Sequence, residues 1–483
     1  MKTAGITTFF VAALALALPI SAQDSEVVTK QYDDGGEYVG TFQDGLQHGT
    51  GTYRLPNGYE FTGDWFEGEI KGNGVARFPN GSVYDGQFAK GKPEGVGKIT
   101  FADGGTYEGT WRDGKITGSG VAIYANGVRY EGSFRNALHH GKGIMTSPNG
   151  YLYDGDWVNG VKEGGAKITY PDSSVYDGRV ADGEREGQGK LTMPDGLIYE
   201  GTWRDGQIDG SGKLVQPNGD IYEGQLVDGR REGAGKVTYA NEDTYEGEFN
   251  NDQRHGQGTF IGKDGYKYEG NWVSGQIEGQ GKVTYPDGSV YEGAFSGDLA
   301  NGKGKITYPD GSTFDGDWKE GVIEGRGVAT YTNGLVYTGE WSNARNHGFG
   351  IMTYPDGYRY EGDWKDGQRH GEGKATYPDG TLYEGQFRDG QRHGEGVITM
   401  AGGFVYDGNW DRGEINGEGV ATYANGDVYT GMFKNGKRQG VGTMRYATGE
   451  EANGDWVNGA LTGKPEEQAD ATPEEAETPA ASE

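Results

Sequence analysis

Apolar residues and glycines recur along most of the chain with a period of 23 residues. Steps of 23 from Tyr38 define nineteen repeats, of which eighteen begin with Tyr or Phe and the last begins with Ala452. We number the positions of each repeat from 0 at this first residue. Glycine occupies positions 2 and 11 in all nineteen repeats. Such a period is typical of an array in which each unit is stabilised by its neighbours.

Each repeat contains two runs with the alternation of a β-strand. In the repeat that begins at Tyr360, positions 0, 2 and 4 read Tyr-Gly-Trp, and positions 11, 13, 15 and 17 read Gly-Gly-Ala-Tyr. Side chains two positions apart lie on the same face of a strand. Asp366-Gly367 follows the first run and Pro378-Asp379-Gly380 follows the second, and both sequences favour tight turns because glycine accepts positive φ. Each repeat is therefore predicted to be a β-hairpin.

The two faces of the predicted sheet differ in composition. All ten Trp residues stand at position 4, and position 15 is apolar in all eighteen complete repeats. We expect Tyr and Trp rings to lie on the glycine backbone of adjacent strands. A ring is expected over position 11 in particular, so that Gly371→Val would cost well over ~1 kcal/mol. Position 1 is Asp or Glu in 14 repeats and position 14 is Lys in eight, which predicts a solvated face with cross-strand ion pairs.

Position 9 varies with position 4. Repeats with Trp at position 4 tend to carry Ile or Leu at position 9, whereas repeats without Trp often carry a base there, such as Arg231 or Arg392. Duplication of hairpin pairs is one interpretation of this alternation. Plugging of one sheet edge by Trp and Ile in every second hairpin is the structural alternative.

The pattern Tyr-Glu-Gly-x-Trp-x-x-Gly-x-x-x-Gly-x-Gly resembles the MORN (membrane occupation and recognition nexus) repeat, and it covers residues 38–463. The resemblance implies an elongated, twisted sheet that acts as a scaffold, in some members dimeric and in some close to membranes. The predicted fold is therefore all-β: a single twisted antiparallel sheet of about 19 tandem hairpins. At ~4.8 Å for each strand, 38 strands would span on the order of 180 Å.

The first 22 residues have the features of a secretory signal peptide. Lys2 precedes an apolar run from Phe9 to Leu18, and Ser21-Ala22 supplies small residues for cleavage. We expect an exported, bacterial-type protein, periplasmic or extracellular after cleavage near Ala22. The predicted division is a signal peptide over 1–22, a lead-in over 23–37, the repeat array over 38–464 and a disordered acidic tail over 465–483.

Composition excludes several classes of site. There are no cysteines, so disulfides and thiolate metal sites are excluded. The formal net charge of −29 argues against a nucleic-acid partner. Six of the seven histidines share position 10, where neighbours in the array would stand about 10 Å apart, too far to share a metal ion. These are His48, His140, His255, His347, His370 and His393. No catalytic, cofactor-binding or metal-binding residue is predicted.

The function most consistent with these features is a non-enzymatic scaffold or interaction platform of the cell envelope. Association with membrane lipid, and binding of glycan or cell wall on exposed rings, are the alternatives. The expected partner is a protein or an envelope polymer, and a homodimer through the edge of a terminal repeat is a further hypothesis.

Basic side chains gather in three consecutive repeats of this acidic chain. The candidate partner-binding edge consists of Arg345, His347, Arg369, His370, Arg392 and His393. A row of cations about 10 Å apart would suit an extended acidic partner, an anionic envelope polymer or the protein's own acidic tail, Glu466 to Glu477. The plainer interpretation is that these residues are solvated and close the turns.

Overall fold

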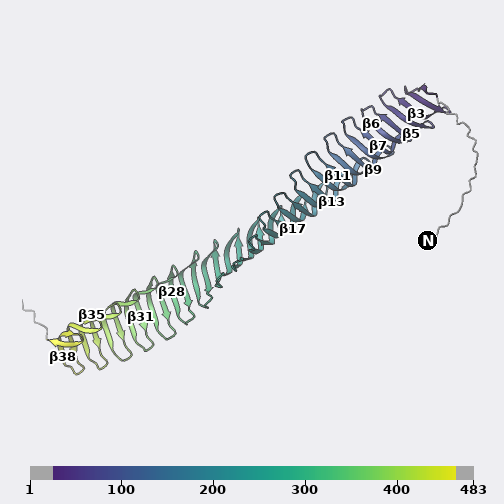
Figure 1. The fold of residues 1–483 in the computed structure, drawn as a ribbon. Helices are drawn as coiled ribbons and strands as arrows, with labels where there is room; N and C mark the ends of the chain where they lie inside the picture. The colour runs from purple at the N-terminus through teal and green to yellow at the C-terminus, as the bar shows by residue number, and fades with distance from the viewer. Residues whose placement is uncertain (1–25, 464–483) are drawn as a thin grey trace, which may run out of the picture. The chain divides into compact units, whose positions relative to one another are not determined.

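The computed structural model describes residues 26–463, and this part of the chain contains 39 β-strands and no helix (Figure 1). The chain divides into two compact units, residues 1–217 and 218–483. The predicted signal peptide and the predicted acidic tail lie outside the described residues. The prediction of an all-β fold is confirmed.

Most hairpins combine a strand of seven residues with a strand of nine. The strands of the first unit are β1 Val28–Gln31, β2 Glu37–Gln43, β3 Leu46–Arg54, β4 Glu60–Phe66, β5 Glu69–Arg77, β6 Val83–Ala89, β7 Lys92–Thr100, β8 Thr106–Arg112, β9 Lys115–Ile123, β10 Arg129–Arg135, β11 Leu138–Thr146, β12 Leu152–Val158, β13 Val161–Thr169, β14 Val175–Ala181, β15 Glu184–Thr192, β16 Ile198–Arg204 and β17 Gln207–Val215. Those of the second are β18 Ile221–Val227, β19 Arg230–Thr238, β20 Thr244–Asn250, β21 Gln253–Ile261, β22 Lys267–Val273, β23 Gln276–Thr284, β24 Val290–Ser296, β25 Leu299–Thr307, β26 Thr313–Lys319, β27 Val322–Thr330, β28 Val336–Ser342, β29 Arg345–Thr353, β30 Arg359–Lys365, β31 Gln368–Thr376, β32 Leu382–Arg388, β33 Gln391–Thr399, β34 Val405–Asp411, β35 Glu414–Thr422, β36 Val428–Lys434, β37 Lys437–Arg445, β38 Glu451–Val457 and β39 Ala460–Gly463.

Within each unit the strands form an open antiparallel sheet in which each strand pairs with its neighbours in sequence (Figure 1). One strand was not predicted from the repeat. β1, in the lead-in, pairs with β2 from Val28↔Gly40 to Gln31↔Glu37. Because β1 lacks the aromatic and glycine pattern of the repeats, it is held beside β2 by backbone pairing. It therefore covers the outer edge of the first repeat.

The predicted turns are confirmed in the hairpin β30–β31 and its connection to β32. Asp366 has φ 50° and Gly367 has φ 86°, which is the left-handed conformation that a two-residue hairpin turn requires. At the other end, the backbone N–H of Thr381 donates to Oδ1 of Asp379 at 2.9 Å. The carboxylate thus closes the turn that leads to the next hairpin.

A β-bulge interrupts the pairing inside each repeat. In β30–β31, Gly362 pairs with Gly373, but the next aligned pair is Trp364 with Arg369. Three residues, 370–372, therefore lie opposite the single residue Asp363. A bulge bends the strand and increases its twist. This places position 4 and position 9 together on the same face as the rings.

Candidate binding groove

The aromatic residue at position 0 forms the floor of one face. All eighteen of these Tyr and Phe side chains are at most 2% exposed. The Tyr360 ring covers two glycines: a Cβ placed on Gly373 would lie 2.5 Å from the Tyr360 hydroxyl oxygen, and one on Gly362 would lie 2.8 Å from it. The hydroxyl donates to the backbone carbonyl of Asp363 at 2.9 Å. The prediction that rings lie on glycine is therefore confirmed for positions 2 and 13.

The prediction for position 11 is wrong. A Cβ on Gly371 would meet the Asp363 side chain, with Oδ2 at 2.6 Å, and no ring. Gly371 has φ 61° and lies in the bulge. The backbone N–H of the next residue, Glu372, donates to Asp363 Oδ2 at 3.2 Å. Position 11 is glycine because the bulge requires a left-handed backbone, not because a ring needs space.

Rings of neighbouring repeats are in contact with one another. The Tyr360 ring meets those of Trp364 and Phe387 edge-on, each with a centroid distance of 5.1 Å. Nε1 of Trp364 donates to the backbone carbonyl of Gly350 at 3.2 Å. All ten Trp side chains are at most 9% exposed. This continuous buried layer gives a single sheet the equivalent of a core.

Burial changes the ionisation of groups on this face. It raises the pKa of Tyr84 to about 12 and shifts that of Tyr360 in the same direction. Burial also lowers the pKa of His139 to about 4; this ring stacks on Tyr130 with a centroid distance of 3.7 Å. The face is therefore partly dehydrated.

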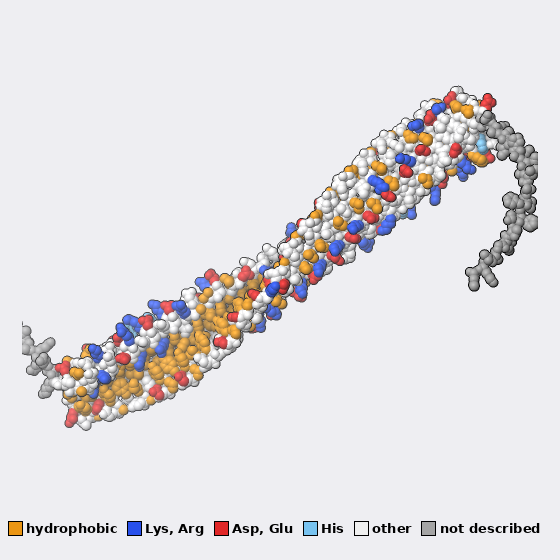
Figure 2. Space-filling model, in the orientation of Figure 1, with side chains coloured by type: hydrophobic (Ala, Val, Ile, Leu, Met, Phe, Trp, Pro, Cys, Tyr) orange, Lys and Arg blue, Asp and Glu red, His pale blue; other side chains and the backbone are white. Residues whose placement is uncertain are grey.

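Above the floor, the face is hollow. In the second unit, Phe314 and Trp341 lie beneath a cavity of about 560 Å³ whose sides include Tyr308, Ile323 and Tyr331. Tyr308 and Tyr331 follow the second strands of successive repeats, β25 and β27, and are 38% and 40% exposed. Figure 2 shows hydrophobic side chains filling a hollowed strip along part of this unit. In each unit, we call the strip with position 0 as its floor and positions 9 and 17 beside it the aromatic groove.

Position 9 carries cations that lean over the rings. Seven of them, the groove cations, are Lys162, Arg185, Arg231, Arg254, Arg369, Arg392 and Arg438. The Arg392 guanidinium stands 4.3 Å from the Trp410 ring centroid, and its Nη2 donates to the carbonyl of Gly413 at 2.9 Å. No repeat has Asp or Glu at position 9. Cation–π packing and a carbonyl acceptor thus hold the six arginines beside the groove. Lys162 instead donates to the Tyr151 hydroxyl at 2.8 Å.

The six residues predicted as one basic edge do not form one row. Arg369 and Arg392, at position 9, are groove cations, and Nη2 of Arg369 donates to the Gly390 carbonyl at 2.7 Å. His347 pairs across the hairpin with Glu340, which makes an ion pair on the opposite, polar face. His370 and His393 hold the same position 10, and Nδ1 of His393 lies 3.5 Å from Oδ1 of Asp411. Arg345 starts β29 at position 8 and is exposed. Adjacent residues of a strand face opposite ways, so the six side chains are divided between the two faces. Their use as a partner-binding edge stays a prediction.

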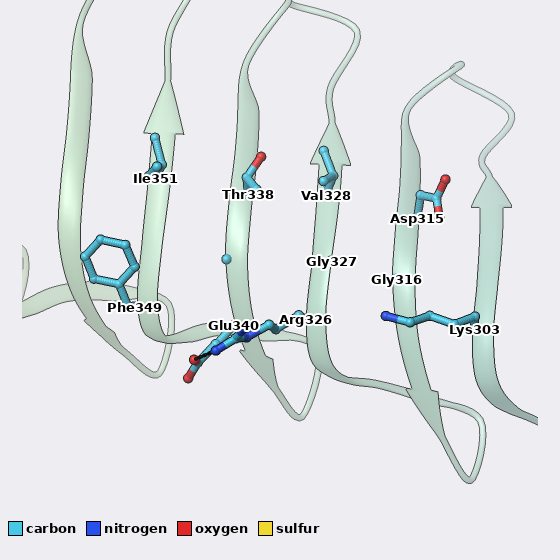
Figure 3. A pocket seen from close by; sticks show the side chains of 11 residues that line it. Lys303, Asp315, Gly316, Arg326, Gly327, Val328, Thr338, Glu340, Phe349 and Ile351 are labelled. Carbon is cyan, nitrogen blue, oxygen red and sulfur yellow. Dashed lines mark hydrogen bonds and ion pairs between the residues drawn. The ribbon is translucent and has the colours of Figure 1, made fainter.

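The polar face contains a second hollow. It has a volume of about 680 Å³ over Gly316, Gly327 and Gly339, beside exposed Phe349 (Figure 3). Arg326 Nη2 and Glu340 Oε1 are 3.3 Å apart at its rim. Elsewhere on this face, Lys282 and Glu292 are paired at 2.6 Å, as expected for positions 14 and 1. The predicted cross-strand ion pairs are confirmed.

Within residues 26–463, no group of three or more His, Cys, Asp or Glu side chains is placed to hold a metal ion. In the same range, no helix is long and apolar enough to cross a membrane.

Several features of the groove were not recognised from the sequence. His139, the histidine outside position 10, lies among Tyr130, Phe134 and Trp157, and its Nε2 is 2.7 Å from the Tyr124 hydroxyl. Contact with rings was predicted for none of the groove cations, although Arg369 and Arg392 were included in the candidate partner-binding edge. The sequence could have indicated this contact. Ile and Arg share position 9, and position 9 lies an even number of positions before positions 13 and 15 of the same strand, so its side chain faces the rings.

Two solved structures are distantly similar to the chain. The TCP10 domain of Danio rerio CPAP, in complex with a peptide of Danio rerio STIL, is 16% identical with a TM-score of 0.18, covering 52% of this chain and 91% of that one. The TCP domain of SAS-4 (dCPAP) from Drosophila melanogaster, in complex with a proline-rich motif of Ana2, is 17% identical with a TM-score of 0.21, covering 42% and 90%. No curated protein sequence matches the chain.

The family model for the MORN repeat matches eighteen successive segments. They are residues 38–58, 61–83, 84–106, 107–129, 130–150, 153–175, 176–198, 199–221, 222–244, 245–265, 268–290, 291–313, 314–336, 337–357, 360–382, 383–404, 406–428 and 429–451. These segments cover most of the chain and have the same 23-residue period as the hairpins. The chain therefore belongs to the MORN repeat family.

Proposed function

We propose that this MORN repeat scaffold is a non-enzymatic, extracytoplasmic platform whose aromatic groove binds an extended partner. The observation that carries the proposal is the cavity of about 560 Å³ between Tyr308 and Tyr331, above the buried rings of Phe314 and Trp341. Partly exposed Tyr side chains over a rigid apolar floor are suited to contact with a polypeptide or an envelope polymer.

The repetition of the groove favours an extended ligand over a compact one. Equivalent positions of neighbouring hairpins are about 10 Å apart, so a linear ligand would meet similar groups at regular intervals. Each contact can be weak, because contacts made by one chain raise the effective concentration for the next.

The experiment compares variants of the two faces in the full chain. Tyr308→Ser with Tyr331→Ser alters the groove, and Val328→Ser with Phe349→Ser alters the polar face at similarly exposed positions. Each protein is immobilised, an envelope extract is passed over it, and the captured proteins and polymers are identified. The affinity of the purified partner is then measured. We expect the groove variant to bind at least about tenfold more weakly and the polar-face variant to bind like the wild type.

Equal binding by the groove variant, with loss in the polar-face variant, would move the site to the polar face. Flotation with vesicles of anionic and zwitterionic lipid tests the lipid alternative, which salt-insensitive binding would favour. The glycan alternative must use Tyr rings, because all ten Trp side chains are buried.

The extracytoplasmic location is supported by the sequence of residues 1–22, which has a basic start, an apolar run and a small-residue exit. The test is the mass and N-terminal sequence of the protein recovered from cells. We expect a chain that begins at Gln23 and fractionates outside the cytoplasm. Recovery of the intact N-terminus in the cytoplasmic fraction would contradict export.

A further inference from the structure

We infer that the chain's own acidic segment, residues 464–483, occupies the aromatic groove of the last repeats and makes ion pairs with Arg369, Arg392 and Arg438. This inference rests on the proposed function, because it identifies a ligand for part of the aromatic groove. It concerns contact within one chain, so its failure would leave partner binding intact.

The three arginines present charge beside the groove. Their guanidinium groups stack on rings: Arg392 on Trp410 and Arg438 on Trp456, each at 4.3 Å, and Arg369 on Phe387 at 5.5 Å. Each also donates Nη2 to a backbone carbonyl of the next hairpin. None of the three makes an ion pair with a carboxylate of residues 26–463. A guanidinium has five N–H donors, so donors remain for a carboxylate ligand.

The segment has the complementary charge. Residues 464–483 contain seven Asp and Glu against one Lys, within a chain whose formal net charge is −29. An acidic ligand would be repelled by most of the protein but attracted by a groove wall on which no repeat places an acid.

The segment also starts in the right place. Arg438 Nη2 is 2.6 Å from the carbonyl oxygen of Gly459, in the final hairpin, and the described chain ends four residues later at Gly463. Twenty extended residues reach about 66 Å. Arg438, Arg392 and Arg369 stand one, three and four hairpins before the last, or about 10, 29 and 38 Å along the sheet. All three are within reach.

The spacing of the acids fits the spacing of the arginines. Glu467, Glu474 and Glu477 are 4, 11 and 14 residues beyond Gly463, which corresponds to about 13, 36 and 46 Å of extended chain. These distances exceed those to Arg438, Arg392 and Arg369 by about 3, 7 and 8 Å. Between Arg438 and Arg392, position 9 is Ile415, and the matching part of the segment includes Ala471 and Pro473. The acidic side chains of the segment would therefore lie opposite the arginines, and its apolar residues would lie opposite Ile415.

The absence of cysteine allows a clean test in the full chain. Ala471→Cys introduces the only thiol, which is labelled with a nitroxide, and the electron paramagnetic resonance line shape reports its mobility. We expect a slow component in the otherwise wild-type protein. Arg369→Gln, Arg392→Gln and Arg438→Gln together, or 1 M salt, should convert it to a fast spectrum.

Arg254→Gln is the matched control. Arg254 also stacks on a tryptophan, 4.0 Å from the Trp272 centroid, and donates to the Gly275 carbonyl at 3.2 Å. Its repeat stands nine hairpins before the last, about 86 Å away and beyond the reach of the segment. The slow component should survive this change.

Three results would overturn the inference. One is a fast spectrum in the otherwise wild-type protein, and another is a slow component that persists in the triple variant. The third is a slow component that disappears when the protein is diluted in buffer, because the segment would then bind a second copy of the chain. A thermal melt of each variant confirms that the repeats remain folded.

Discussion

The two faces of the hairpin β30–β31 are stabilised by different interactions. On one face, the buried Tyr360 ring lies on Gly373 and meets Trp364 and Phe387. On the other, Lys374 of β31 pairs with Glu384 of the next strand, β32, while their side chains remain 45% and 53% exposed. Burial of an aromatic ring contributes far more than an exposed ion pair. The ring-bearing face therefore contributes most of the stability of the array. The glycines at positions 2 and 13 lie under its rings, whereas the glycine at position 11 faces the polar side chain of Asp363.

The largest effect is expected from Gly373→Val. The new side chain would occupy the space of the Tyr360 ring, so the ring must leave its place between Gly362 and Gly373. We expect a loss of about 3 kcal/mol. An array need not unfold in two states, so hydrogen exchange of residues 360–387 is the suitable measurement. Tyr360→Phe is the control, and it should cost only about 1 kcal/mol through the lost hydroxyl bond.

On the polar face, Gly371 separates backbone strain from crowding. Gly371→Val places a β-branched residue at φ 61° and should cost about 2 kcal/mol. Gly371→Asn should cost clearly less, because Asn accepts positive φ, as Asn343 does at 48° and Asn458 at 51°. Thermal melts of both variants measure the difference. Equal losses would show that contact with Asp363, and not the backbone, sets the requirement for glycine.

A pH titration tests how dry the ring-bearing face is in the first unit. The pKa of His139, lowered by burial to about 4, lies below its ordinary 6.5, so the unfolded chain takes up a proton first. His139 should therefore weaken folding as pH falls from about 6.5 towards 4. His139→Ile, which copies Ile116 of the preceding repeat, should remove this part of the pH dependence. Parallel pH profiles for the two proteins would show that His139 is well solvated.

The smallest effect is expected from the ion pair on the polar face. A double-mutant cycle with Lys374→Met and Glu384→Gln should give a coupling of about 0.5 kcal/mol, reduced by salt. Chemical denaturation at low and high ionic strength measures it. A salt-independent coupling above about 2 kcal/mol would remove the contrast between the two faces.

Most of the fold could be predicted because period and alternation are properties of the sequence. Period and alternation were enough to predict the hairpins, the turn at Asp366-Gly367 and the rings that lie on glycine. The bulge could not be predicted, since a period of two assumes one residue opposite one, whereas three residues lie opposite Asp363. β1 was missed because backbone pairing needs no side-chain pattern. That the six basic residues are divided between two faces could have been predicted, because Arg369 and His370 are adjacent in a strand and face opposite ways.

Pairing between sequence neighbours has a consequence for how such a protein changes over generations. In β18–β39 each hairpin contacts the hairpins before and after it, through almost the same set of residues. Gain or loss of 23 codons would then join surfaces that already fit, and neither the reading frame nor the strand register would be disturbed. The length of the binding surface is thus inherited in steps of about 10 Å. A lineage can adjust the reach of the protein without redesigning any contact.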